Sequence, residues 1–156
     1  MKWIAVDYGE RRTGLAVCDA SELIVTPVTP QIEEKSLNKV AEAAAAARLA
    51  QGAESVVCGL PRNMDGTEGS RCVKSRRFAA RLATACGVPV VLWDERRTTV
   101  TAAGILSANS TFGADRKARL DSVSAAVILE SFLAWRKAHP GEEPPEVAAP
   151  TAPEQA

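Results

Sequence analysis

The opening of the chain constrains the fold more than any other stretch. A short apolar run, Trp3–Val6, ends at the carboxylate of Asp7, and a second apolar run, Leu15–Val17, follows a turn that contains Gly9 and Gly14. Two apolar runs joined by a glycine-containing turn predict a β-hairpin, here with an acidic residue where the first strand ends. On these residues alone, an ordinary hairpin with a solvated turn is an equal alternative.

The rest of the chain predicts a third strand and then alternating helices and strands, from the spacing of its apolar residues and the positions of glycine and proline. The expected elements are a strand at 23–28, a helix at 33–51, a strand at 55–58, a helix at 70–85, a strand at 88–93, a helix at 98–109, a loop at 110–119 and a last helix at 120–137. Pro27 favours a sheet edge for its strand because proline cannot donate to the ladder. This order indicates an α/β fold with a five-stranded mixed sheet flanked by helices.

We expect one folded domain, residues 1–138, followed by a disordered tail, residues 139–156. The tail holds five of the nine prolines, is rich in alanine and glutamate, and contains no lysine or arginine. All nineteen basic residues therefore lie in the domain together with fifteen of the nineteen acidic ones, which gives it a mild positive charge. Because no apolar segment approaches the length of about 20 residues that a membrane helix needs, and no signal peptide is evident, we expect a cytoplasmic protein without a membrane partner.

Several classes of chemistry are disfavoured by composition. His139 is the only histidine, which argues against a Ser-His-Asp triad or a histidine-bound zinc ion. The four cysteines show no CxxC spacing and are expected to be buried thiols. Six basic and two acidic residues between Arg62 and Arg81 would suit a phosphate-rich partner, although a solvated helix face explains them equally well.

Three carboxylates occupy positions that a hydrophobic core would not favour. Asp7 ends the first predicted strand, Glu95 follows the last one, and Asp121 lies in the first turn of the final helix, on a face of small and apolar residues. A favourable interaction with the helix dipole would also explain Asp121. Three inward carboxylates would repel one another without a cation, and Mg²⁺ or Mn²⁺ prefers such oxygen ligands. Carboxylate-bound metal beside a basic groove favours phosphodiester hydrolysis.

Four segments resemble the signature blocks of the YqgF/RuvX family, namely residues 7–14, 59–69, 94–99 and 120–129. Proteins of this family are RNase H-like and are described as Holliday junction resolvases and as pre-16S rRNA nucleases. The resemblance covers about residues 1–137. It implies an RNase H-like fold, a catalytic and metal-binding site at Asp7, Glu95 and Asp121, dependence on a divalent metal, and a role in ribosomal RNA maturation.

One position departs from the pattern of better-studied RNase H-like nucleases. In those proteins a glutamate commonly ends the fourth strand, whereas here the segment reads Cys58-Gly59-Leu60 and the acid follows the fifth strand. Whether Glu95 takes that place, and whether Asp94 shares it, stays open at this point.

The leading hypothesis is a metal-dependent endonuclease that processes the 5′ end of precursor 16S rRNA during ribosome biogenesis. Five basic residues are assigned to the phosphate backbone: Arg12, Arg62, Arg96, Arg97 and Lys117. The expected partners are precursor rRNA and ribosomal particles, bound by a monomer or a homodimer.

Three alternatives are retained. A Holliday junction resolvase would keep the chemistry but act on branched DNA, which calls for a dimer. A non-catalytic RNA-binding assembly factor would bind RNA without cleaving it. The phosphate loop of an actin-like ATPase or sugar kinase also matches the opening turn, but such proteins need two domains and this chain supplies one.

Overall fold

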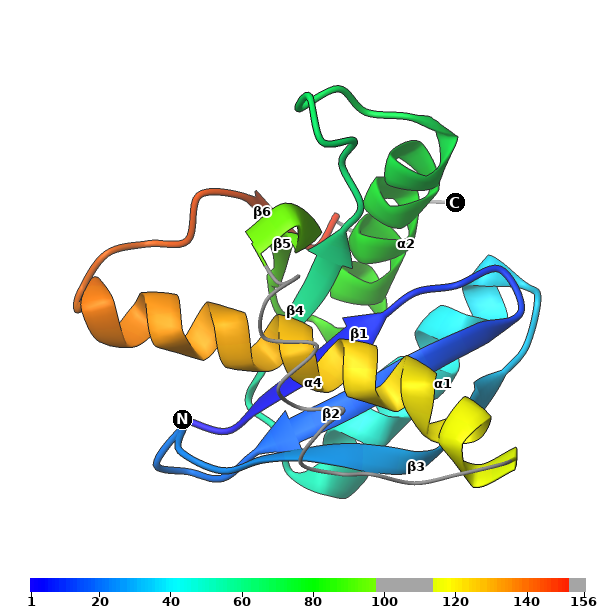
Figure 1. Ribbon diagram of the computed structural model, residues 1–156, viewed down its shortest axis with the longest axis horizontal. Helices are drawn as coiled ribbons and strands as arrows, with labels where there is room; N and C mark the ends of the chain where they lie inside the picture. The colour runs from blue at the N-terminus through cyan, green and yellow to red at the C-terminus, as the bar shows by residue number, and fades with distance from the viewer. Residues whose placement is uncertain (98–113, 152–156) are drawn as a thin grey trace.

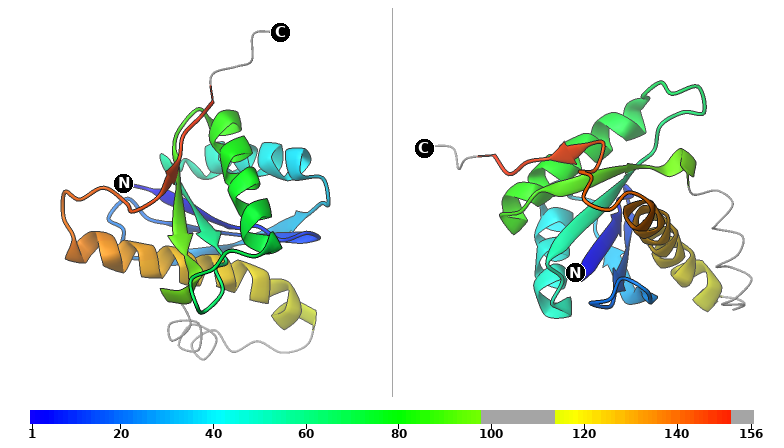
Figure 2. Two further views of the ribbon diagram at one scale, coloured as in Figure 1. Left: turned by 90° about the horizontal axis from the view of Figure 1, so that it is seen from above. Right: turned by 90° about the vertical axis from the view of Figure 1, so that its left-hand side faces the viewer.

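A computed structural model describes the backbone of residues 1–97 and 114–151, and the side chains of residues 1–96 and 123–151. Its middle layer is a six-stranded mixed sheet in the order β3-β2-β1-β4-β5-β6. Helices α1 and α2 cover one face of the sheet and α4 crosses the other (Figure 1 and Figure 2). The elements are β1 (Trp3–Asp7), β2 (Arg12–Cys18), β3 (Val25–Glu33), α1 (Leu37–Gln51), β4 (Ser55–Leu60), α2 (Ser70–Cys86), β5 (Val90–Asp94), the 3-10 turn η1 (Glu95–Arg97), α4 (Ala114–Ala138) and β6 (Val147–Ala148).

The first three strands form the predicted antiparallel meander. β1 pairs with β2 and β2 pairs with β3, which lies at the edge of the sheet as Pro27 predicts. The third strand begins two residues later than expected, because the Asp19 carboxylate accepts hydrogen bonds from the amides of Leu23 and Ile24, both at 2.9 Å, and holds them in the turn.

β4 lies between β1 and β5 and runs parallel to both. Its Cys58 is the register partner of Val6 in β1 and of Leu92 in β5. The two crossovers are helices α1 and α2, which end at glycines with φ of 68° and 70°. Since parallel strands end on the same side, the carboxyl ends of β1, β4 and β5 meet at one edge of the sheet.

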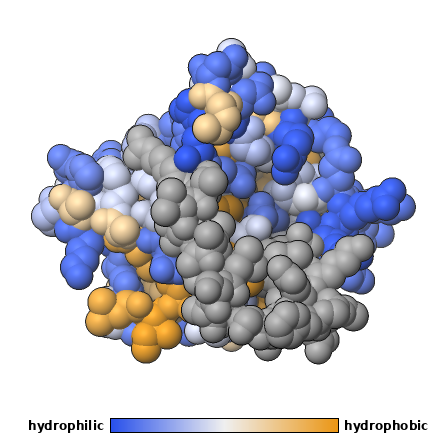
Figure 3. All heavy atoms as spheres, viewed as in Figure 1, coloured by the Kyte–Doolittle hydropathy of each residue, from blue (hydrophilic) through white to orange (hydrophobic). Residues whose placement is uncertain are grey.

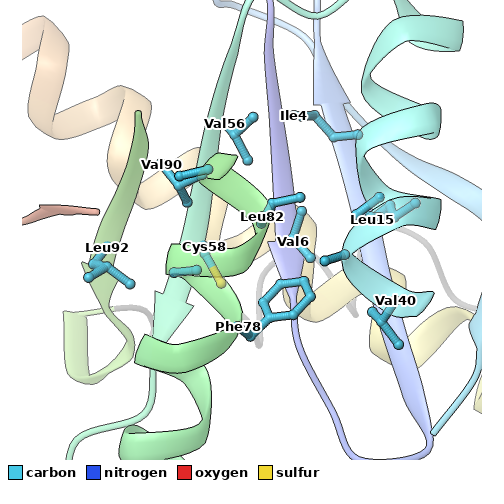
Figure 4. Close-up of a cluster of buried hydrophobic side chains, with 14 of the residues drawn as sticks. Ile4, Val6, Leu15, Val40, Val56, Cys58, Phe78, Leu82, Val90 and Leu92 are labelled. Carbon is cyan, nitrogen blue, oxygen red and sulfur yellow. The ribbon is translucent and has the colours of Figure 1, made fainter. Parts of the chain in front are cut away.

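Alternate residues of the central strands feed two hydrophobic cores. Ile4 and Val6 face α1 and α2, in the core whose side chains Figure 4 shows around Phe78. Trp3 and Ala5 face α4, where Trp3 meets Phe132 edge-on at 4.7 Å between ring centroids. Because side chains alternate along a strand, Asp7 belongs to the α4 side of the sheet.

Two expectations about the second half of the chain are wrong. The loop predicted at 110–119 is helical from Ala114, since Ala114–Arg119 is composed mainly of good helix formers. The sheet has six strands instead of five, because Val147 and Ala148 in the supposedly disordered tail pair with Val91 and Val90 and cover what would be an open sheet edge. The helix expected at 98–109 lies outside the described residues. Within the described part of the chain, no helix has the length and hydrophobicity needed to cross a bilayer.

Candidate active site

The carboxylate of Glu95 lies over β4 at the carboxyl edge of the sheet. Glu95 directly follows β5, yet a Cβ added to Gly59 of β4 would lie only 3.0 Å from its Cδ and Oε2 atoms. The same added Cβ would lie 2.6 Å from Cδ1 of Ile128 in α4. Gly59 therefore leaves the space through which Glu95 reaches across β4, toward the strand that ends in Asp7.

Two pKa shifts show that the region around Asp7 and Glu95 disfavours negative charge. Burial raises the pKa of Glu95; the nearby Arg71 guanidinium opposes this shift, and Asp94 adds to it. Beneath the edge, burial raises the pKa of the Cys58 thiol, and the carboxylates of Glu95 and Asp7 raise it further. Both carboxylates thus act on the same buried thiol, and a cation beside them would favour their ionised forms.

The third predicted ligand, Asp121, is placed only by its backbone. It lies in α4, seven residues or about two turns before Ile128, the residue that closes over Gly59. Its side chain lies outside the described set. Among the side chains that the structure describes, no group of three possible ligands comes together, so Asp7 and Glu95 are the described part of the predicted site.

Asp94 turns to the other side of the sheet. Asp94 lies two residues after Leu92, which packs in the core with α1 and α2, so both side chains are on the same side of the sheet. The Asp94 carboxylate accepts hydrogen bonds from Arg96 Nε at 3.0 Å and from Arg96 Nη2 at 2.6 Å. Burial acts to raise the pKa of Asp94, but the hydrogen bonds of Arg96 and the charge of Arg62 bring it below its ordinary value. Asp94 therefore positions two arginines on the side of the sheet opposite α4, and its charge still contributes to the raised pKa of Glu95.

A cavity of about 410 Å³ opens beside Glu95. It is lined by loop residues 61–64, the first residues of α2, Glu95 and Arg96. Gly69, the N-cap of α2, makes no side-chain capping hydrogen bond, so the helix start offers its partial positive charge to an anion. Figure 3 shows that hydrophilic residues dominate the upper part of this face, where α2 and the loop lie.

The predicted phosphate contacts divide into three groups. Arg62 and Arg96 line the cavity. Arg12 does not line the cavity. It lies on β2, with its Nε atom 3.9 Å from Oε1 of Glu33. The side chains of Arg97 and Lys117 lie outside the described set. Sequence reasoning did not single out Arg71, which lines the cavity and acts on Glu95, although it belongs to the basic cluster between Arg62 and Arg81.

The three-layer arrangement, with an acidic edge where β1, β4 and β5 end, is that of the RNase H-like fold. The structure is similar to Thermus thermophilus RuvC in complex with a Holliday junction substrate, with a TM-score of 0.59 and 14% identity over 88% of this chain and 96% of that chain. A second Thermus thermophilus RuvC structure gives a TM-score of 0.53 and 13% identity, over 88% of this chain and 97% of that one. At these identities the likeness concerns the fold alone.

The sequence defines the family more narrowly. The family RuvX, described as Holliday junction resolvase, matches residues 1–135, and the chain belongs to it. A relative in Syntrophus aciditrophicus is 40% identical over 133 residues, covering 85% of this chain and 88% of the relative. A relative in Myxococcus xanthus is 41% identical over 135 residues, covering 85% of this chain and 87% of the relative. Both carry the name "Putative pre-16S rRNA nuclease".

Proposed function

We propose that this protein is a metal-dependent endonuclease that hydrolyses phosphodiester bonds and processes the 5′ end of precursor 16S rRNA. The observation that carries the proposal is the Glu95 carboxylate held over Gly59, between the ends of β1 and β5 and beside an arginine-lined cavity. The names of the relatives support ribosomal RNA as the substrate.

The residues at the edge suit a hard divalent cation. Asp7 and Glu95 offer oxygen ligands, and the raised pKa of Glu95 means that an ionised carboxylate there gains from a neighbouring positive charge. We assign Asp7, Glu95 and Asp121 as the ligands of Mg²⁺ or Mn²⁺. When bound, such a metal would lower the pKa of the attacking water and stabilise charge on the phosphate oxygens.

The cavity supplies the contacts to the nucleic acid strand. Arg71 and the uncapped start of α2 offer positive charge beside Glu95, and Arg62 and Arg96 extend this surface along the loop. Arg12, Arg97 and Lys117 are assigned to the same nucleic acid strand. These groups hold phosphates without reading bases, so specificity would come from RNA shape or from the ribosomal particle.

The experiment is single-turnover cleavage of a precursor 16S rRNA fragment in Mg²⁺. We expect Asp7→Asn and Glu95→Gln each to reduce cleavage by more than the roughly 10- to 100-fold typical when a group that only supports a metal ligand is lost, since each removes a charged ligand itself. Glu42→Gln is the matched control, because Glu42 is exposed on α1, on the face of the sheet opposite α4. This variant should cleave like the wild type. Equal rates for all four proteins would refute the catalytic assignment. RNA binding without any cleavage would favour an assembly factor.

Branched DNA is the second candidate substrate, because the family description names Holliday junctions. Symmetric resolution of a four-way junction requires two active sites related by a twofold axis. Cleavage of a synthetic four-way junction by a dimeric form, faster than cleavage of the RNA fragment, would favour this alternative.

A further inference from the structure

The tail places a carboxylate between two arginines of the basic cluster that lies between Arg62 and Arg81 in the sequence. Glu146 forms ion pairs with Arg62 and with Arg76 Nη2, the latter at 2.8 Å. Arg62 lines the cavity beside Glu95, and Arg76 lies on α2. The arginine side chains are 22% and 36% exposed and that of Glu146 is 28% exposed, so solvent and solutes reach this cluster.

Both arginines also have partners that do not belong to the tail. Arg76 donates to the two Glu68 oxygens from Nε at 2.7 Å and from Nη2 at 2.6 Å, and these hydrogen bonds help to lower the pKa of Glu68 to about 2. Arg62 lies 3.6 Å from Asp94. The domain therefore orients both guanidiniums without help from Glu146.

With the tail in place, the ion pairs of this cluster join equal numbers of guanidiniums and carboxylates, and the charge of Asp65 also reaches Arg96. Three guanidiniums (Arg62, Arg76 and Arg96) meet three carboxylates (Glu68, Asp94 and Glu146). Without Glu146, Arg62 and Arg76 lose the one carboxylate of the tail that they share. Forked guanidiniums held in this way are suited to phosphate oxygens as well as to carboxylate oxygens.

We propose that Arg62 and Arg76 form a phosphate-binding subsite for the nucleic acid strand, and that Glu146 of the tail occupies this subsite until the strand displaces it. This inference rests on the proposed function, because it takes the cavity beside Glu95 as the path of the substrate. The tail then acts as a built-in competitor that weakens nucleic acid binding.

The attachment of the tail permits such an exchange. β6 pairs with β5 over two residues, supplemented by a hydrogen bond from the Leu92 amide to the Glu146 carbonyl oxygen at 3.0 Å and one from the Thr151 amide to Thr84 Oγ1 at 3.2 Å. These contacts do not involve the Glu146 carboxylate, so the side chain can leave the arginines while β6 stays paired. The family match ends at residue 135, before this segment, so the competitor lies outside the part of the chain that the family defines.

The test measures binding of a labelled single-stranded RNA oligonucleotide, with Asp7→Asn present in every protein to prevent cleavage. Glu146→Gln should tighten binding roughly 5-fold at about 50 mM salt and steepen the dependence of log K on log salt by about 0.7, the increment for one added phosphate contact. Glu143→Gln is the matched control, since it removes the same charge from an exposed position of the tail. Adding Arg76→Gln to Glu146→Gln should abolish the gain.

The outcomes separate this inference from the proposed function. RNA binding that is equal in the Glu146→Gln and Glu143→Gln proteins would overturn the inference alone, as would a gain that survives Arg76→Gln. The two proposals can also separate. Tighter RNA binding that is specific to Glu146→Gln, together with no RNA cleavage by the protein that keeps Asp7, would support the subsite and refute the nuclease. No RNA binding by any of these proteins would overturn both.

Discussion

Gly59 determines how far the Glu95 side chain can reach across the sheet. Any side chain at position 59 would fill the space between β4 and Ile128, where the Glu95 carboxylate now lies. The acid that RNase H-like nucleases commonly carry at the end of the fourth strand is absent from this chain. In our proposal, Glu95 supplies it from the next strand, over a glycine that makes room.

Gly59→Ala should therefore reduce both the cleavage rate and the stability of the fold. The added Cβ meets Ile128 Cδ1 at 2.6 Å and Glu95 at 3.0 Å, so one of these side chains must move. We expect a loss of about 10- to 100-fold in the single-turnover rate from misplacement of the carboxylate, with a destabilisation of roughly 1–3 kcal/mol.

The added variant Ile128→Val tests this geometry, because it removes the Cδ1 atom and should restore part of the activity of Gly59→Ala. Unchanged cleavage by Gly59→Ala alone would show that Glu95 does not need its present position. Urea unfolding of each variant gives the stability with which the rates are compared.

Glu95→Gln should stabilise the metal-free protein at neutral pH while it abolishes cleavage. Burial raises the pKa of Glu95, so the folded state holds this proton more tightly than the unfolded state, and stability falls as the pH rises from the ordinary carboxyl pKa through the raised one. Glutamine cannot ionise and avoids that loss. Each kcal/mol regained should raise the midpoint temperature by about 2–4 °C.

Thermal unfolding in a chelator between about pH 4 and pH 8 measures this effect. The advantage of Glu95→Gln should be small at the acidic end, where the wild-type carboxyl is protonated, and complete above the raised pKa. A variant that is less stable than the wild type at pH 8 would contradict the assignment of burial as the cause.

At the scale of elements, α4 determines whether the proposed metal site can assemble. It is the helix that carries Asp121, and it is fixed to the sheet by Phe132, which is buried and lies edge-on to Trp3 and Trp93. The Trp93 indole also donates a hydrogen bond to Ser131 Oγ at 3.1 Å. The position of α4 on the sheet thus depends on an aromatic cluster that includes Trp93, the register partner of Gly59.

Phe132→Ala should destabilise the protein by about 3–5 kcal/mol, because it empties a fully buried site between α4 and the sheet. Equilibrium urea unfolding measures the change. Leu49→Ala is the comparison, since Leu49 is 73% exposed on α1 and should change stability by less than about 0.5 kcal/mol. Similar losses from both substitutions would contradict the packing described here.

At the scale of the whole molecule, the sequence predicted the elements with strong patterns and missed those without them. The parallel strand at 55–58, the helix at 70–85 and the edge position of Pro27 follow from apolar runs, glycine stops and the missing amide hydrogen of proline. β6 could not be found in this way, because two residues in a proline-rich segment have no periodicity. Its pairing is set by the open edge of β5, which exists only in the folded molecule.

The candidate site shows the same division. That Asp7 and Glu95 lie at one edge of the sheet could be predicted, because Asp7 ends one strand, Glu95 follows another, and parallel strands end on one side. The carboxylate partners of the arginines could not be predicted from the sequence, since the contacts of Arg62 with Asp94 and Glu146 span 32 and 84 residues. Arg62 and Arg96 are expected to bind phosphate, and in the structure both form ion pairs with carboxylates of the chain itself.

The measurement that tests the central claim most directly is the crystal structure of the protein with Mn²⁺, with the metal located by its anomalous signal. We predict a manganese ion bonded to carboxylate oxygens of Asp7, Glu95 and Asp121 at the carboxyl edge of the sheet. An ion bound elsewhere, or an Asp121 side chain turned away from the other two carboxylates, would contradict the account.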